Sequence, residues 1–194
     1  NPTLQPQEAN NYLAGFEYRP EYVPGLKFAL DYFRIERENI PGGSTQYIID
    51  ENFRTGGPGV GIFSNLIDFD PVTQTYNSVR VPTLNLSSDT LDGFDIAASY
   101  DLALSKVGLD GWGKVIFELN WQYLLTYEQV QIPGGSTVDR LGDFSADEFG
   151  YGTLPRLKGY GSMFWYYKDL ELGFYANYTD DYIDDKNAAD RSVN

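Results

Sequence analysis

The stretch GKVIFELNWQYLLTYE, residues 113–128, decides the fold, because two kinds of side chain alternate along it. From Val115 to Tyr127 every second residue is apolar or aromatic, and most of the residues between them are polar. A period of two predicts a β-strand whose faces have different surroundings. Strands commonly run about five or six residues, whereas a strand that crosses a membrane needs roughly 9–11. We therefore expect a transmembrane strand with Trp121 and Tyr127 facing lipid and Glu118 facing the interior.

The composition narrows the function classes. The chain has 194 residues, no Cys, no His and a formal net charge of −14. Without Cys and His it has no thiolate nucleophile and few ways to build a metal or acid–base site. We therefore expect no enzyme, no metal and no cofactor. The negative charge argues against nucleic-acid binding, which needs a basic surface.

The same alternation recurs along the chain. Strands are expected at about residues 11–19, 26–37, 89–104, 113–129, 157–167 and 170–179. Short links join the strands in pairs, whereas residues 39–88 and 130–155 form long loops, the first without predicted structure. Short turns that alternate with long outside loops are typical of bacterial outer-membrane barrels. We predict an all-β chain whose antiparallel up-and-down strands, about six of them, form part of a large transmembrane β-barrel.

Three loop motifs carry no predicted chemistry. The hexapeptide IPGGST occurs at residues 40–45 and again at 132–137, where Pro-Gly-Gly supplies a bend. The glycine cluster at residues 56–61 lacks the Lys-Ser/Thr pair of a phosphate-binding loop. The acids at residues 180–185 are expected to be solvated rather than calcium ligands.

Several motifs resemble segments of TonB-dependent outer-membrane receptors. The beginning, NPTLQPQEANNY at residues 1–12, is similar to a segment that enters a barrel strand in that family. Further similar motifs follow in the family's order; they are PGL at 24–26, DYFRI at 31–35, LDGFD at 91–95, YLL at 123–125, PR at 155–156 and NYTD at 177–180. Each motif is loose, and the resemblance rests on their order and spacing over essentially the whole chain.

The resemblance implies a barrel of about 22 strands in the bacterial outer membrane, closed around an N-terminal plug. Such receptors take up a siderophore, cobalamin, an oligosaccharide or a peptide, with energy supplied through TonB. Six strands cannot close a barrel whose smallest forms have about eight, so we expect a fragment from the later half. The implied partners are the plug, the remaining strands, TonB through the plug, outer-membrane lipid and a small extracellular solute.

Two groups of residues are candidates for binding. Polar side chains on the interior face are expected to hydrogen-bond with the plug or with water, since a buried polar group without a partner is costly; they are Glu17, Arg19, Asp31, Asp95, Glu118, Asn120, Gln122, Glu171 and Asn177. Aromatic side chains in the long loops could stack on a ligand, although packing against each other is favoured; they are Tyr47, Phe53, Phe63, Tyr76, Phe144, Phe149 and Tyr151.

Two other functions stay open. A soluble all-β module could hold carbohydrate with the loop aromatics, and it would be a monomer without detergent. A passive porin would share the membrane wall but would have no plug. The membrane interpretation predicts that this segment alone aggregates or needs detergent, because it exposes two strand edges and a lipid face.

Overall fold

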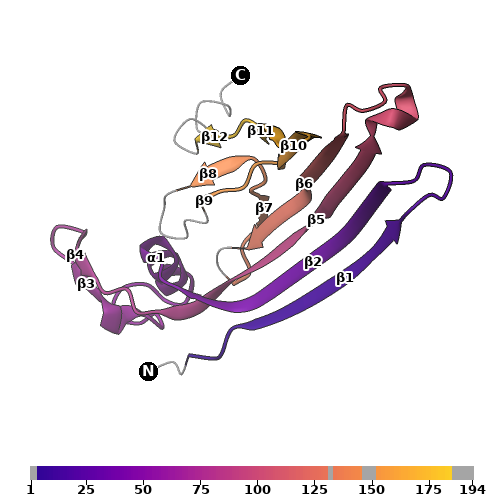
Figure 1. Cartoon of the computed structure of the whole chain (residues 1–194). Helices are drawn as coiled ribbons and strands as arrows, with labels where there is room; N and C mark the ends of the chain where they lie inside the picture. The colour runs from indigo at the N-terminus through magenta and orange to yellow at the C-terminus, as the bar shows by residue number, and fades with distance from the viewer. Residues whose placement is uncertain (1–3, 131–132, 146–151, 185–194) are drawn as a thin grey trace, which may run out of the picture.

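One antiparallel sheet dominates the computed structural model, which describes residues 4–130, 133–145 and 152–184 (Figure 1). Its strand order is β1-β2-β5-β6-β10-β11. The bounds are β1 Glu8–Tyr18, β2 Leu26–Gly42, β5 Leu84–Ala103, β6 Lys114–Val130, β10 Leu157–Tyr167 and β11 Leu170–Thr179. The expected antiparallel up-and-down arrangement of six strands is confirmed. Among the described residues β1 and β11 each pair on one side only, so the sheet is open and is not closed into a barrel.

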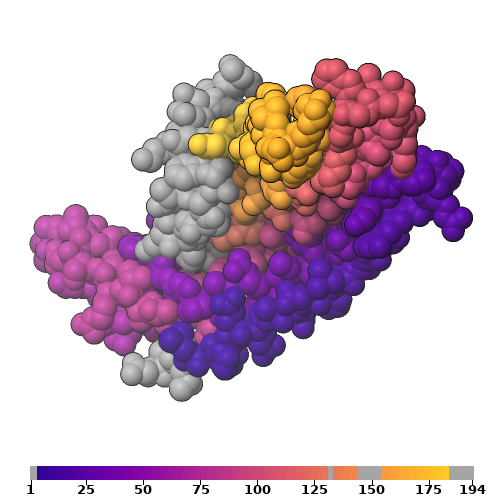
Figure 2. All heavy atoms as spheres, in the orientation of Figure 1, coloured from indigo at the N-terminus to yellow at the C-terminus, as the bar shows by residue number. Residues whose placement is uncertain are grey.

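The connections differ between the two ends of the sheet. Short links follow β1, β5 and β10, and the link after β5 contains the 3-10 turn η2, Leu104–Val107. Long connections follow β2 and β6, at the opposite end. Figure 1 shows α1 and the small strands β3 and β4 at that loop-bearing end. In the space-filling view of Figure 2 the β3–β4 segment, in magenta, projects beyond the sheet.

The connection from β2 to β5 is folded, which corrects the expectation of an all-β chain with a structureless loop at residues 39–88. It contains α1 Thr45–Arg54, the 3-10 turn η1 Ser64–Leu66, and the hairpin of β3 Ile67–Asp70 and β4 Thr75–Val79. The Ser44 hydroxyl accepts a hydrogen bond from the Tyr47 backbone N–H at 3.1 Å. A serine in this position caps a helix N-terminus, and the cap explains why a helix begins here.

The two copies of IPGGST have different structures. In the first copy Gly42 ends β2 and Ser44 caps α1. In the second, Gly134 has φ +73° and Thr137 begins the short strand β7, Thr137–Asp139, which pairs with β6. The remaining small strands are β8 Asp143–Ser145, β9 Gly152–Thr153 and β12 Ile183–Asp184. The same hexapeptide thus precedes a helix in one place and a strand in the other, so its sequence alone does not decide which element forms.

Strand β6 contains a bulge that reverses its alternation. Leu124 pairs with Gly93 and Thr126 pairs with Asp92, so Leu125 has no partner of its own on β5. An extra residue of this kind exchanges the faces of the residues beyond it. Tyr127 therefore shares the face of Leu124 and is 2% exposed. The expectation that Tyr127 lies on the same side as Trp121 was wrong for this reason.

The buried apolar side chains gather at the loop-bearing end. Phe33, Leu124 and Tyr127 are buried on one face of the sheet, and Ile48 of α1 is fully buried. Most side chains in the middle of the six strands are exposed or half-buried. Among the described helices, none is long and apolar enough to cross a bilayer.

Candidate functional site: the two faces of the sheet

One face of the sheet carries most of its polar side chains, and we call it the polar face. One row of cross-strand partners on this face consists of Gly15, Asp31, Asp95, Gln122, Lys158 and Thr179. The adjacent row consists of Glu17, Ala29, Ala97, Asn120, Tyr160 and Asn177. The register thus brings residues from all six strands, far apart in sequence, onto one surface.

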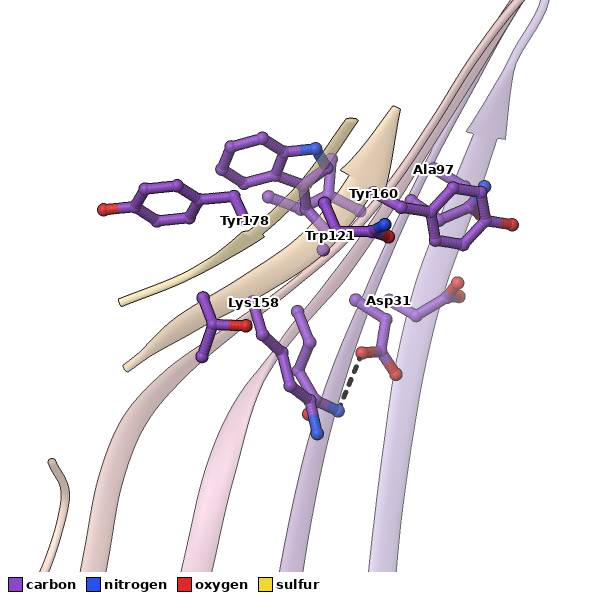
Figure 3. Close-up of a pocket in the computed structure, with 13 residues that line it drawn as sticks. Asp31, Ala97, Trp121, Lys158, Tyr160 and Tyr178 are labelled. Carbon is purple, nitrogen blue, oxygen red and sulfur yellow. Dashed lines mark hydrogen bonds between the residues drawn. The ribbon is translucent and has the colours of Figure 1, made fainter. Parts of the chain in front are cut away.

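A hollow of about 580 Å³ lies on the polar face (Figure 3). Five of the predicted interior-facing residues line it; they are Asp31, Asp95, Asn120, Gln122 and Asn177. The Gln122 side-chain amide donates a hydrogen bond to the Asp95 carboxylate at 3.1 Å, drawn as a dashed line in Figure 3. Lys158 and Tyr160 also line the hollow. The sequence interpretation did not include Lys158 or Tyr160 among the interior-facing residues. The alternating pattern does place these two side chains on the same face of β10.

Two carboxylates stand directly opposite each other in this hollow. Asp31 and Asp95 are cross-strand partners, and like charges in this position repel. The Asp31 carboxylate leans away from Asp95 toward β1, where a Cβ on Gly15 would overlap it. Gly15 therefore provides the space that lets the two charges separate.

A second hollow of about 450 Å³ adjoins the first on the polar face. Glu17, Arg19 and Glu118 line it, and Arg19 forms an ion pair with Glu17. Lys27 also lines this hollow and was not among the predicted residues. Glu171 lies apart from both hollows, near the turn end, where its cross-strand partner is Tyr166. The nine predicted polar residues thus share one surface, and its orientation toward a lumen stays a prediction.

The opposite face is apolar, and we call it the apolar face. One of its rows consists of Phe16, Leu30, Ile96, Trp121, Gly159 and Tyr178, and the next of Tyr18, Phe28, Ala98, Leu119, Gly161 and Ala176. Phe16 is 56% exposed and Phe174 is 61% exposed. Contiguous exposed apolar surface of this kind marks a site that meets another molecule or a membrane.

Aromatic side chains fill the gaps that glycine leaves on the apolar face. The rings of Trp121 and Tyr178 stack on the two strands that flank Gly159, with centroids 5.7 Å apart and planes 13° apart. In Figure 3 these two rings lie side by side, on the other side of the strands from Lys158. A Cβ on Gly159 would lie 2.7 Å from Trp121 Cγ, so the close packing of Trp121 requires glycine on β10.

A second aromatic group lies at the turn end. The rings of Trp112, Trp165 and Tyr167 stack on one another, with centroids 5.6–6.2 Å apart. The indole N–H of Trp165 donates to the Trp112 carbonyl at 2.9 Å. The Lys168 ammonium lies 5.1 Å from the centre of the Tyr167 ring. Rings with a polar atom, next to a cation, suit a boundary between apolar and aqueous surroundings.

An ion pair between a partly exposed arginine and a buried aspartate connects β2 and β5 at the loop-bearing end. Arg37 donates to both carboxylate oxygens of Asp89, and the Tyr127 hydroxyl donates to Asp89 at 3.3 Å. Asp89 is 5% exposed. A two-point pair of this kind holds the strands in register because its geometry is specific.

Replacing Asp89 with alanine is expected to lower the free energy of unfolding by about 1–3 kcal/mol, since Arg37 and Tyr127 lose a common acceptor. Urea titration of the purified protein measures this change. The matched control is Glu36→Ala, which removes the more exposed pair with Arg34 and should cost less than about 1 kcal/mol. Equal costs for the two variants would contradict a structural role for the Asp89 pair.

The loop aromatics pack against each other. Tyr47 and Phe63 meet edge to face at 6.0 Å, and Tyr76 contacts Phe53 at 6.2 Å and Phe69 at 5.4 Å. Burial raises the pKa of the Tyr47 hydroxyl. Phe149, Tyr151 and the side chain of Phe144 lie outside the described residues. Mutual packing was the favoured interpretation, and the described aromatics follow it, while Phe53 remains 53% exposed.

Two acidic residues of the β2–β5 connection, Glu51 and Asp70, have stabilising contacts within the protein. Side-chain hydrogen bonds from Arg54 lower the pKa of Glu51. The backbone N–H of Val72 and contacts with Thr73 lower the pKa of Asp70. The described residues contain no group of three acidic side chains that could hold a metal ion.

Comparison of the chain with protein-family models, with curated proteins and with solved structures found no match.

Proposed function

We propose that this chain is a section of the wall of a bacterial outer-membrane β-barrel, in a receptor that takes up a small solute rather than an enzyme. The observation that carries the proposal is the pairing of a polar face with an apolar face along six long antiparallel strands. A strand that separates lipid from a lumen needs this division. The open edges of β1 and β11 would pair with the remaining strands of the barrel.

The dimensions of the apolar face support a membrane position. On β10 the apolar face extends from Leu157 to Tyr167, which are ten residues apart. At about 3.3 Å per residue and a tilt near 45°, this length covers roughly 23 Å along the membrane normal. The apolar band of outer-membrane barrels is about 25 Å tall.

Charged side chains bound this band at both ends. Toward the loops the apolar face continues with Arg34 and Glu36, which form an ion pair at 2.8 Å. At the turn end Lys168 follows the aromatic group of Trp112, Trp165 and Tyr167. At the turn end, the order of charge, aromatic ring and hydrocarbon side chain is the order that a bilayer requires.

TonB-dependent uptake is the finer part of the proposal, and its support is the sequence resemblance. In such a receptor the polar face would meet the plug, and the two hollows would receive its polar side chains or water. The solute would bind in the long connections, where Phe53 and Tyr76 are exposed. A plug and a TonB box encoded upstream in the gene would support this part of the proposal. A gene that encodes a barrel without them would favour a passive porin instead.

An epitope tag inserted after Val72 of the full-length protein is expected to be labelled by antibody on intact cells. Val72 is 88% exposed at the tip of the β3–β4 hairpin, so an insertion there should leave the fold intact. The control is the same tag inserted after Asp110, in the turn between β5 and β6. It should be labelled only after the outer membrane is permeabilised, and labelling of the Asp110 tag on intact cells would overturn the orientation.

A further inference from the structure

The sequence contains two Asp-Gly pairs, and the structure places them in opposite surroundings. Asp110 and Gly111 are both exposed in the turn between β5 and β6. Asp92 and Gly93 are both buried within β5, which pairs with β2 on one side and with β6 on the other. Asp-Gly pairs are chemically labile because glycine has no side chain that hinders attack by its own backbone nitrogen. The two pairs therefore allow a comparison within one chain.

We infer that Asp110 is a site of spontaneous isoaspartate formation in the folded protein, whereas Asp92 is protected. In this reaction the Gly111 backbone nitrogen attacks Cγ of Asp110. An N–Cγ bond forms, and the amide hydrogen leaves with the carboxyl hydroxyl as one water molecule. Addition of one water to the resulting succinimide then breaks one of its two C–N bonds. Breaking the bond to Cγ restores aspartate, and breaking the bond to the backbone carbonyl carbon gives isoaspartate, so the reaction needs only water.

The turn leaves both reacting groups free. Within the part of the chain that the structure describes, the Asp110 carboxylate and the Gly111 N–H have no hydrogen-bond partner. The Trp112 N–H closes the turn by donating to the Leu109 carbonyl at 3.3 Å. Gly111 has φ +81°, and even an added Cβ would meet nothing within 4 Å. The Asp110–Gly111 peptide can therefore rotate toward the carboxyl group without loss of a hydrogen bond of its own N–H.

The second Asp-Gly pair is held from several sides. Asp92 is 8% exposed, and its carboxylate accepts hydrogen bonds from the hydroxyls of Tyr32, at 3.2 Å, and Thr126. A Cβ on Gly93 would lie 3.1 Å from the Phe33 ring. Rotation of the Asp92–Gly93 peptide would require β5 to separate locally from its neighbours. Such an opening costs free energy in a paired strand and little in an exposed turn.

The product would lie next to the aromatic group of Trp112, Trp165 and Tyr167. Isoaspartate continues the backbone through its side-chain carbon, so it lengthens the turn by one atom. The Trp112 carbonyl, two residues further on, accepts the hydrogen bond from the Trp165 indole. Isomerisation of Asp110 should therefore shift Trp112 against Trp165 and change the tryptophan fluorescence of the modified protein.

The experiment incubates the purified, folded protein at neutral pH and physiological temperature and follows isoaspartate over time. Peptides are separated by liquid chromatography and identified by electron-transfer fragmentation, which distinguishes isoaspartate from aspartate. Isoaspartate is expected to form at least about ten times faster at residue 110 than at residue 92, which corresponds to about 1.4 kcal/mol or more of local opening at Asp92. In concentrated urea this protection is lost, and the two rates should approach each other.

The matched control is Asp110→Glu, which keeps the negative charge. Its carboxyl group would have to close a larger ring, which forms much more slowly, so modification at residue 110 should disappear while Asp92 behaves as before. Equal rates at the two sites of the folded protein would overturn the inference. An Asp110 that reacts in urea but not in the folded protein would also overturn it, because the turn would then be held. An isoaspartate form with unchanged fluorescence would contradict the expected shift of Trp112.

Discussion

Replacing Gly113 with alanine is expected to lower the free energy of unfolding by about 4 kcal/mol or more, a cost found only where a core, charge or backbone feature is broken. Gly113 precedes β6 and has φ +82°. This left-handed conformation costs an L-residue about 1–2 kcal/mol. In addition, a Cβ here would overlap the backbone carbonyl oxygen of Tyr166, so β10 would have to move away from β6.

The same turn supplies a matched control in Gly111. Gly111 has φ +81°, but a Cβ there would meet nothing within 4 Å. Gly111→Ala should therefore show the conformational cost alone, about 1–2 kcal/mol. Urea titration of the full-length protein in micelles compares the two variants. If the Gly113→Ala and Gly111→Ala variants lose equal stability, the close contact between the turn and β10 is not the reason that residue 113 must be glycine.

The sheet could be predicted from the sequence because its signal is local and repeated. Alternation over long segments identifies strands, and the lengths of the connections give antiparallel neighbours. The predicted polar residues share a face for the same reason, since a period of two fixes the face once a strand is identified. Predicting cross-strand partners, such as Lys158 and Gln122, also requires the register between the strands. The alternating pattern does not give this register.

Other features depend on interactions that alternation does not record. The bulge at Leu125 follows from the pairing of β6 with β5 near Gly93, so Tyr127 changed faces without any local signal. A Cβ on Gly93 would lie 2.6 Å from the Tyr123 carbonyl oxygen, which shows how closely the strands approach there. The helix α1 had a signal that was missed: Ser44 can cap a helix, but two preceding glycines favoured a turn.

Replacing Leu119 with arginine is expected to lower the free energy of unfolding by about 2–4 kcal/mol if the apolar face meets lipid, because Leu119 lies midway along the apolar side of β6. The measurement is urea unfolding of the full-length protein from vesicles. Leu119 is 36% exposed. In a soluble carbohydrate-binding module, the same change at a surface position would alter the stability by less than about 0.5 kcal/mol.

The controls use the same strand, which keeps the local structure constant. Asn120→Arg places the charge on the polar face next to Leu119, beside the hollow that contains Asp31 and Asp95, and should cost little. Val115→Arg places it on the apolar face nearer the turn end, where the cost near the membrane interface falls to about 0–1 kcal/mol. In a protein–protein interface, an arginine would lower the stability wherever the contact is buried. In a bilayer, the loss of stability depends on how far the residue lies from the membrane interface. Equal costs at Leu119 and Val115 would therefore refute the membrane position of this face.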